Sequence, residues 1–411
     1  MPAASSSADR ALASAPAMSP VLVVLVLSLL LGIQPVTTDL YLPALPALTE
    51  SFGAPVSQSQ LTLTTLLLAF GLSQLAWGPL SDRFGRRPVL LLGLGAYTVA
   101  SVGAALAGSM TLLVVWRTVQ GAAIGATVMG ARAIVRDLFA PEAGARALSK
   151  ALTGLGVIAC LCAPVGGLLT DLFGWRYALG ALAVFGAATL ALVATRFEET
   201  VSRKNPAALH PGTLLRTWLT VLRHPSFIAY SALSVATYAG LFTFLGSSSF
   251  IFIKVLGYTR TQYGLAMFAT AFVYILGTVL CRRLLPRLGI KRSVALAGAV
   301  SLAGGTLLGV LAHAGVQSGW AILAPFLLYM LGHGVHQPCG NSGAVGPFPH
   351  AAGAASALNG FLMMLTAFAV GGWIGPRLDG TVFALTDGVW FWSVCIALVA
   401  WTLVRRHGGP S

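Results

Sequence analysis

Residues 78–91 read GPLSDRFGRRPVLL, a short charged turn between two long apolar runs. The stretch combines turn-forming residues with one acid and three arginines: Gly78, Pro79, Gly85 and Pro88, and Asp82, Arg83, Arg86 and Arg87. Glycine and proline favour tight turns, and arginines concentrate in short loops on the inner face of a membrane. The stretch therefore predicts a tight cytoplasmic loop that joins two membrane-spanning helices.

The whole chain has the composition of an integral membrane protein. Hydrophobic residues make up 56% of its 411 residues and charged residues only 9%. Its mean hydropathy is +0.83, so it cannot cover itself with polar surface in water. A membrane span needs about 20 apolar residues. Clusters of turn residues and charges divide the chain into about twelve such spans, near 20–42, 57–80, 88–108, 110–133, 147–170, 175–195, 226–248, 262–283, 291–313, 318–340, 352–375 and 383–404.

The formal net charge of +14 does not indicate a nucleic-acid partner, because the Lys and Arg residues lie in short loops between apolar runs. They are concentrated in alternate loops. By the positive-inside rule, this pattern predicts that both termini are cytoplasmic in a bacterial-type inner membrane. Residues 1–18 are expected to form a disordered cytoplasmic tail, and residues 406–411 a second, short one.

The polar stretch 196–224 separates six spans from six and is expected to be a cytoplasmic linker between two halves, 19–195 and 225–405. An internal repeat supports this division, because PRLGIKR from Pro286 echoes DRFGRR from Asp82. The second copy has proline in place of the aspartate. The sequence thus predicts an all-α membrane protein with two pseudo-symmetric six-helix bundles around a site near the midplane.

The charged turn resembles the loop between the second and third helices of major facilitator superfamily transporters, G-x-L-x-D-R-x-G-R-R/K. Every position of that pattern is filled, by Gly78, Leu80, Asp82, Arg83, Gly85, Arg86 and Arg87. The resemblance implies the major facilitator fold, with rocking of the two bundles as the transport movement. It also implies that the loop is a conformational latch, in which Asp82 caps a neighbouring helix start or pairs with an arginine.

Charges inside spans are costly and are functional candidates by default. Asp39 lies toward the outer end of the first span, and Arg117 in the outer half of the fourth. On a helix Asp39 shares a narrow polar face with three residues: Ser28, Gly32 and Pro35. Arg117 lies near Gln120 and Gly121. Two plainer alternatives stay open: a helix cap at the outer surface for Asp39, and a structural tie to backbone carbonyls for Arg117.

Four stretches resemble the bicyclomycin/chloramphenicol-resistance (Bcr/CflA) branch of drug:proton antiporters: TDLYLPALP (38–46), RTVQG (117–121), GWR (174–176) and AGAASALNG (352–360). By this resemblance Asp39 is the protonatable carboxylate and Arg117 its coupling cation. The exporters' fifth-helix motif G-x-x-x-G-P-x-x-G-G is matched only in part. Pro164 and Gly167 fit, whereas three glycines are replaced, by Ala159, Ala163 and Leu168. Close helix packing is expected at Gly121, Gly156, Pro164 and Gly167.

A substrate cavity is expected to include polar and aromatic side chains from several spans: Tyr41, Gln120, Tyr238, Phe242, His336, Gln337, Asn341 and Asn359. Plain helix packing is the alternative for each of them. The spacing of His333, His336 and Cys339 fans these side chains over about 120° of the helix, which argues against a metal site.

The sequence therefore predicts a proton-coupled antiporter that exports small amphipathic, drug-like molecules. The alternative is proton-linked transport of one dedicated metabolite or siderophore. A membrane enzyme is not expected, since the chain has no nucleotide-binding loop, H-E-x-x-H or G-x-S-x-G motif. The expected partners are the small-molecule substrate, protons and the lipid bilayer. We expect a monomer with no cofactor, which uses the proton gradient as its energy source.

Overall fold

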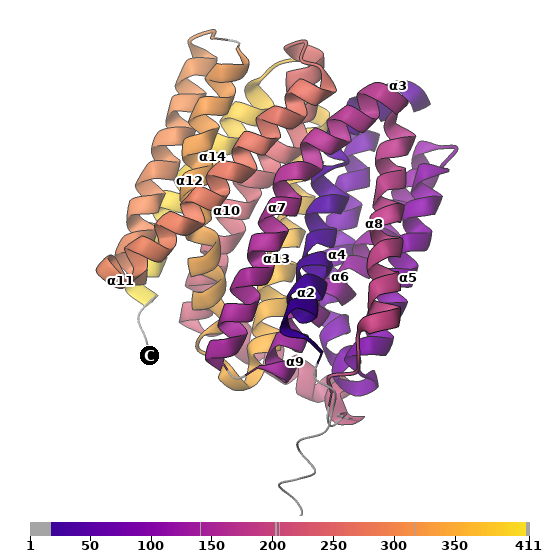
Figure 1. Ribbon diagram of the computed structural model, residues 1–411. Coiled ribbons are helices and arrows are strands. Elements are labelled where there is room, and N and C mark those ends of the chain that lie inside the picture. The colour runs from indigo at the N-terminus through magenta and orange to yellow at the C-terminus, as the bar shows by residue number, and fades with distance from the viewer. Residues whose placement is uncertain (1–17, 140, 202–203, 205, 317, 408–411) are drawn as a thin grey trace, which may run out of the picture.

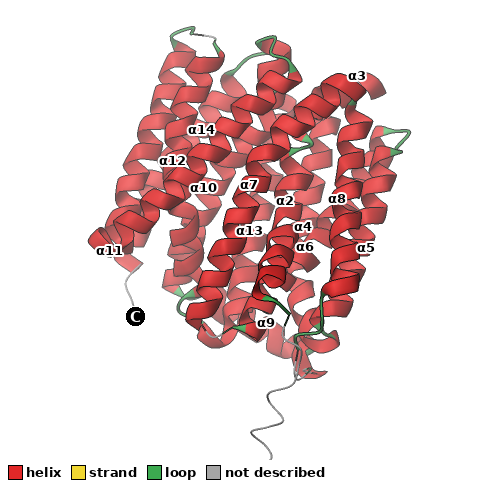
Figure 2. Cartoon of the chain, in the orientation of Figure 1, coloured by secondary structure: helices red, strands yellow, loops and turns green. Residues whose placement is uncertain are grey.

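The computed structural model describes residues 18–139, 141–201, 204, 206–316 and 318–407. Most of the two predicted tails, and Asn205 in the linker, lie outside these ranges. The described chain is helical and contains no strand (Figure 2). Its α-helices are α2 (Pro20–Asp39), α3 (Leu45–Phe52), α4 (Val56–Phe84), α5 (Arg86–Ala105), α6 (Met110–Leu138), α7 (Pro141–Phe173), α8 (Trp175–Arg196), α9 (Pro211–Leu222), α10 (Pro225–Phe250), α11 (Arg260–His313), α12 (Gly319–Val345), α13 (Ala352–Ile374), α14 (Phe383–Val399) and α15 (Arg405–His407).

Twelve membrane spans are present in this described part. Ten helical segments are long and apolar enough to cross a membrane. One of them, α11, has 54 residues and supplies two spans, because its backbone turns at Gly289. The twelfth span is α12, with 27 residues. Its apolar character is diluted by His333 and His336, which lie inside the protein and not toward lipid. The predicted all-α fold of about twelve spans is confirmed.

Two glycines make the sharp reversals at one end of the molecule. Gly85 joins α4 to α5 with a φ of 110°, and Gly289 turns α11 with a φ of 70°. Residues with a side chain rarely adopt these angles, so glycine is needed at both places. The repeat found in the sequence, around Asp82 and Pro286, therefore corresponds to two equivalent turns in the two halves.

The two halves form bundles that lie side by side, the N-terminal bundle in indigo to magenta and the C-terminal bundle in orange to yellow (Figure 1). Two helix pairs make the main contacts between them, α4 with α13 and α7 with α11. Each pair joins the second span of one half to the fifth span of the other. This pseudo-symmetric pairing leaves a space between the bundles at their centre, where the candidate site lies.

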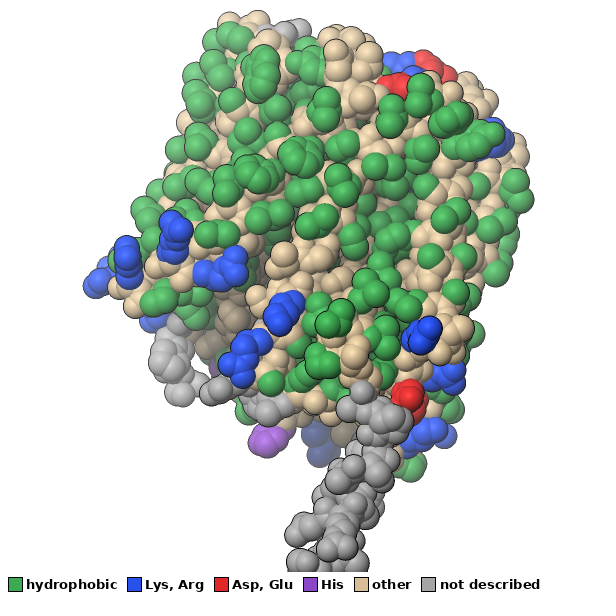
Figure 3. All heavy atoms as spheres, viewed as in Figure 1, with side chains coloured by type: hydrophobic (Ala, Val, Ile, Leu, Met, Phe, Trp, Pro, Cys, Tyr) green, Lys and Arg blue, Asp and Glu red, His purple; other side chains and the backbone are tan. Residues whose placement is uncertain are grey.

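The surface shows how the molecule sits in a bilayer. Apolar side chains cover the middle of the visible face, and Lys and Arg gather toward the lower end in the view of Figure 3. We call this end, which carries the turns at Gly85 and Gly289, the basic end, and the opposite one the far end. Large apolar residues such as Val184, Trp320 and Phe391 are exposed on the apolar band. A band of this kind is stable only against lipid.

Three details differ from the predicted spans. The fourth span continues as a helix to Leu138, beyond the expected end at residue 133, and Phe139 in an extended conformation ends it. The linker contains an amphipathic helix, α9, with exposed Leu215 and Leu219. The first span ends at Asp39, and the separate helix α3 follows it at the far end.

Candidate functional site

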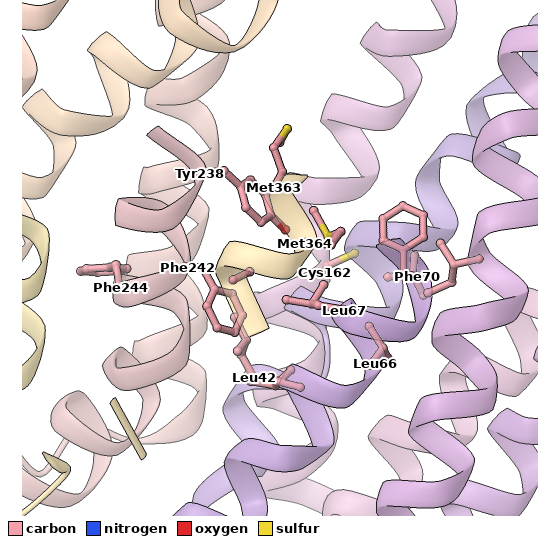
Figure 4. Packing of buried hydrophobic residues seen from close by; sticks show 14 of the residues in the cluster. Leu42, Leu66, Leu67, Phe70, Cys162, Tyr238, Phe242, Phe244, Met363 and Met364 are labelled. Atoms are coloured by element: carbon pink, nitrogen blue, oxygen red, sulfur yellow. The ribbon is translucent and has the colours of Figure 1, made fainter. Parts of the chain in front are cut away.

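A central cavity of about 360 Å³ lies between the two bundles. Its polar wall comes from α2, α4, α6, α10, α11, α12 and α13: Gln34, Thr38, Asp39, Gln74, Arg132, Tyr238, Thr270, Tyr274, His333, Gln337, Asn341 and Ser356. The apolar wall includes Phe70, Met363 and Met364, and Figure 4 shows the two methionines between Tyr238 and Phe70. The volume suits one small molecule, and methionines adapt to ligands of different shape.

Asp39 is the last residue of α2, and its side chain lies on the cavity wall. The Thr38 hydroxyl donates a hydrogen bond to Asp39 Oδ1 at 2.8 Å. Among the described residues no Lys, Arg or His forms an ion pair with this carboxylate. An acid in this position has one partner from the protein and room for a proton or a ligand on its other side.

Arg117 lies behind this part of the wall and has no exposed surface. Its guanidinium donates to the carbonyl oxygen of Thr37 at 3.0 Å and, more weakly, to that of Thr62 at 3.4 Å. It also donates to Gln120 Oε1 at 3.0 Å and stacks over the Tyr41 ring, 4.1 Å from the centroid. Arg117 therefore fastens the end of α2, next to Asp39, to α4 and α6.

By the resemblance Arg117 was expected to be the coupling cation of Asp39, but its guanidinium has other partners in this structure. This side chain does not line the cavity and makes no ion pair with Asp39 in the described structure. Its bonds are those of the structural tie to backbone carbonyls that the sequence left as the alternative. Any influence of Arg117 on Asp39 passes through the position of the α2 end.

Three of the eight predicted cavity residues lie on the wall: Tyr238, Gln337 and Asn341. Tyr41 and Gln120 do not, because both belong to the Arg117 network. The Tyr41 hydroxyl lies 2.7 Å from Thr62 Oγ1, and Gln120 Nε2 donates to Ser101 Oγ at 2.8 Å.

The other three predicted residues also lie away from the cavity wall. Phe242 is buried in the core, next to Gly371 of α13. His336 faces α11, with Nε2 3.4 Å from the carbonyl oxygen of Val294. Asn359 Nδ2 donates to Asn341 Oδ1 at 2.7 Å, so it orients a wall residue from behind.

His333 lies on the cavity wall and was missed as a site residue. Its Nδ1 is 2.9 Å from Thr237 Oγ1, which leaves the other ring nitrogen for the cavity side. The signal was present in the sequence, since His333, Gln337 and Asn341 are spaced four apart and share one helix face. No group of three metal-binding side chains occurs within the described ranges.

A second hollow, of about 750 Å³, lies between the bundles at the basic end. We call it the vestibule. Gly78, Asp82, Arg86, Arg136 and Trp218 are among its lining residues. It is separated from the central cavity by a neck, whose residues line both hollows: Gln74, Arg132 and Ser356. Arg132 Nη1 donates to Ser356 Oγ, which joins the two bundles across the neck.

The predicted latch residues form a compact charge network beside the vestibule. Arg86 Nη1 donates to Asp82 Oδ1 at 2.6 Å, and Arg86 Nε to Asp137 Oδ2 at 2.8 Å. Glu199 accepts from the backbone N–H groups of Arg86 and Arg87, at 2.8 and 3.2 Å, and so caps the start of α5. Arg83 does not join this network: its guanidinium lies over the ring of its neighbour Phe84.

Asp137 and Glu199 had not been singled out from the sequence, because neither lies in the 78–91 stretch. A Cβ at Gly85 would overlap the carboxylate of Glu199, so the glycine is needed for this contact as well as for its φ.

At the far end the two bundles are held together. Asp171, near the end of α7, accepts from the backbone N–H and the hydroxyl of Thr261 at 2.9 and 2.7 Å and from Arg260 at 3.2 Å. These donors belong to the first turn of α11, so Asp171 caps that helix across the interface. Gln60 Nε2 donates to the carbonyl oxygen of Gly246 at 2.5 Å nearby. The central cavity is therefore closed at the far end.

The predicted packing residues lie at helix crossings. Gly121 faces the backbone of Leu66, where an added Cβ would overlap a carbonyl oxygen. The other three lie where α7 meets α11: Gly156 near Ile275, Pro164 against Gly264, and Gly167 against the carbonyl of Arg260. Small residues bring these backbones close, as is common between helices in membranes.

Comparison with known proteins gives consistent results along most of the chain. Residues 27–372 match the family profile described as Major Facilitator Superfamily. Multidrug resistance protein D of Escherichia coli (strain K12) is 29% identical over 338 residues, which cover 82% of this chain and 84% of that protein. A chloramphenicol resistance protein of Pseudomonas aeruginosa is 29% identical over 326 residues, or 78% of this chain and 75% of the relative.

Solved structures agree on the fold. The xylose transporter XylE from E. coli, in a partially occluded inward open conformation, superposes with a TM-score of 0.74 and 16% identity. The match covers 94% of this chain and 97% of that one.

Proposed function

Since this chain belongs to the major facilitator superfamily, we propose that it exports small amphipathic, drug-like molecules across the inner membrane in exchange for protons. The family and the fold are those of a transporter. The observation that carries the proposal is a largely apolar cavity between two bundles, whose wall includes the carboxylate of Asp39. Among the described residues this carboxylate forms no ion pair, and the Thr38 hydroxyl donates a hydrogen bond to it. The names of the relatives, for multidrug and chloramphenicol resistance, support drug-like cargo.

In this proposal cargo enters from the cytoplasm through the vestibule and the neck. The bundles then rock, so that the contacts of Asp171 with α11 break at the far end and the vestibule closes. Asp39 takes up a proton when the cavity faces outward and gives it up when it faces inward. Cargo and proton share one cavity, and their mutual exclusion there couples the two movements.

The test of this function is an export assay in inverted membrane vesicles that contain the protein, with a panel of drug-like compounds. We expect uptake into the vesicles with a proton gradient and none after a protonophore is added. Gradient-driven uptake of a single compound out of a broad panel would support a dedicated transporter instead.

We predict that the basic end is cytoplasmic, because cations concentrate in the inner loops of membrane proteins. Reporter fusions at Asn205 and Gly408 should then both show a cytoplasmic location. Fusion at Gly315, in the far-end connection between α11 and α12, is the matched control and should report the periplasm. A periplasmic reporter at either of the first two positions would contradict this topology.

We predict that Asp82→Asn impairs transport without loss of membrane insertion. In this structure Asp82 pairs with Arg86 and lines the vestibule, and on the other bundle α13 starts at the same hollow without a side-chain cap. Closure would bring the carboxylate toward this positive helix start, a contact that the amide makes more weakly.

The comparison variant is Asp171→Asn, which weakens the contact at the far end instead. Single cysteines at the two ends report which end is open by their rate of thiol labelling. Asp82→Asn should raise the labelling rate at the basic end and lower it at the far end, and Asp171→Asn should do the opposite. Transport at the wild-type rate by purified and reconstituted Asp82→Asn protein would rule out the latch.

A further inference from the structure

Arg132 occupies an unusual position for a cation. It lies on α6 in the neck between the two bundles, where its exposed side chain lines both hollows. Among the described residues its guanidinium donates a hydrogen bond to the neutral hydroxyl of Ser356. No acid of the described chain forms an ion pair with it, whereas Arg86, on the same vestibule, has both Asp82 and Asp137.

An arginine at this depth needs compensation. Charged side chains inside a membrane protein are costly unless they meet a counter-charge or a water-filled space. Arg117 shows how this chain fixes a cation for structure, since it is fully buried and its donors go to carbonyl and amide oxygens on three helices. Arg132 is held by one hydroxyl and keeps donors available on the cavity side. It therefore lacks the environment of a purely structural arginine.

Most of the charged side chains that line the vestibule next to Arg132 are also positive. The vestibule is lined by Arg86, Arg132, Arg136 and His350, and by the single acid Asp82. Because Asp82 is already paired with Arg86, Arg132 and Arg136 leave this lining with a net positive charge. A narrow space with low-dielectric walls strengthens such a field and raises the local concentration of anions.

We propose that Arg132 is a specificity residue that binds a carboxylate, or another anionic group, of the cargo in the neck. This inference rests on the proposed function and narrows its cargo to small amphipathic acids, with the apolar body among Phe70, Met363 and Met364. On binding, the carboxylate replaces Ser356 as the hydrogen-bond acceptor of the guanidinium. It accepts two hydrogen bonds in a bidentate contact, which a single hydroxyl cannot do. Release of the bond to Ser356 removes a link between the bundles at the neck.

The test measures binding in detergent, without any gradient. The probe is 7-diethylaminocoumarin-3-carboxylic acid, a fluorescent acid at neutral pH, and the matched probe is its neutral ethyl ester. Wild-type protein should bind the acid more tightly than the ester. Arg132→Gln should weaken binding of the acid about tenfold, the loss expected for a charge-assisted hydrogen bond, and leave the ester within about twofold of wild type.

Three further variants separate binding from structure. Arg132→Lys keeps the charge and should retain part of the preference for the acid. Arg136→Gln removes a cation that lines only the vestibule and should leave the ratio of the two affinities unchanged. Ser356→Ala breaks the link across the neck but should not weaken binding of the acid. Equal losses for acid and ester in Arg132→Gln, or a wild-type protein that does not prefer the acid, would overturn the proposal.

The same probes distinguish this inference from the proposed function. Arg132-dependent binding of the acid without gradient-driven movement in inverted vesicles would refute export and leave the binding site standing. Gradient-driven uptake of the ester by a protein with no preference for the acid would support export and refute the role of Arg132.

Discussion

Asp39→Asn is expected to abolish proton-driven accumulation of cargo in inverted vesicles, while binding of cargo without a gradient survives. The amide has nearly the same size as the carboxylate and can still accept the hydrogen bond from the Thr38 hydroxyl, which lies 2.8 Å from Oδ1. It cannot take up and release a proton in the physiological range. The substitution therefore removes the exchange of protons for cargo and leaves the shape of the cavity in place.

Proton release is the decisive measurement for this variant. Addition of cargo to wild-type protein in weakly buffered detergent should release protons, and addition to Asp39→Asn protein should not. Asp379→Asn, an acid in the far-end loop before α14, is the control and should behave as wild type. Unchanged proton release from the Asp39 variant would falsify the role assigned to this carboxylate.

Arg117→Lys is expected to lower both stability and transport, with partial activity at best. The guanidinium reaches the carbonyls of Thr37 and Thr62 and the amide of Gln120 together, and the single ammonium group of lysine cannot span three such acceptors. A buried group left without its partner costs about 1–3 kcal/mol. The end of α2 would then be less firmly held, so that Asp39 is less well placed.

Thermal unfolding in detergent, measured together with transport, checks this prediction. The matched control is Arg377→Lys, because Arg377 also contacts a ring and a carbonyl, both of Trp373, but lies exposed at the far end. The control should unfold at about the wild-type temperature. A normal melting temperature and full transport in Arg117→Lys would show that the tie to α2 is dispensable.

The fold was largely predictable because the bilayer imposes two constraints on the sequence. Each span must be long enough to cross the apolar core, and charged residues must lie mainly in the loops. Ten of the helical segments in the described chain are evident from their composition. Turn residues and charges supplied the rest: they predicted two separate spans on either side of Gly289 within α11, and the span of α12, although its polar side chains face the protein interior.

The site was less predictable because it depends on which side chains meet across two bundles. The sequence predicted a polar face of the first span that includes Asp39. Asp39 and Pro35 of that face line the cavity, whereas Ser28 and Gly32 pack against α7. The neck was not visible, since Gln74, Arg132 and Ser356 come from three distant spans. The latch motif indicated Asp82 and Arg86, but Asp137 and Glu199 complete the network from outside the motif.

In the proposed orientation, the contact of Asp171 with the first turn of α11 faces the periplasm, whose salt content varies with the surroundings of the cell. Charge and helix-dipole contacts weaken as ionic strength rises. The network around Asp82, in contrast, faces the buffered cytoplasm. The conformation of the transporter without cargo should therefore depend on external salt. At low ionic strength the far-end contacts hold and the inward-open state is favoured. At high ionic strength these contacts weaken and the outward-open state becomes more populated.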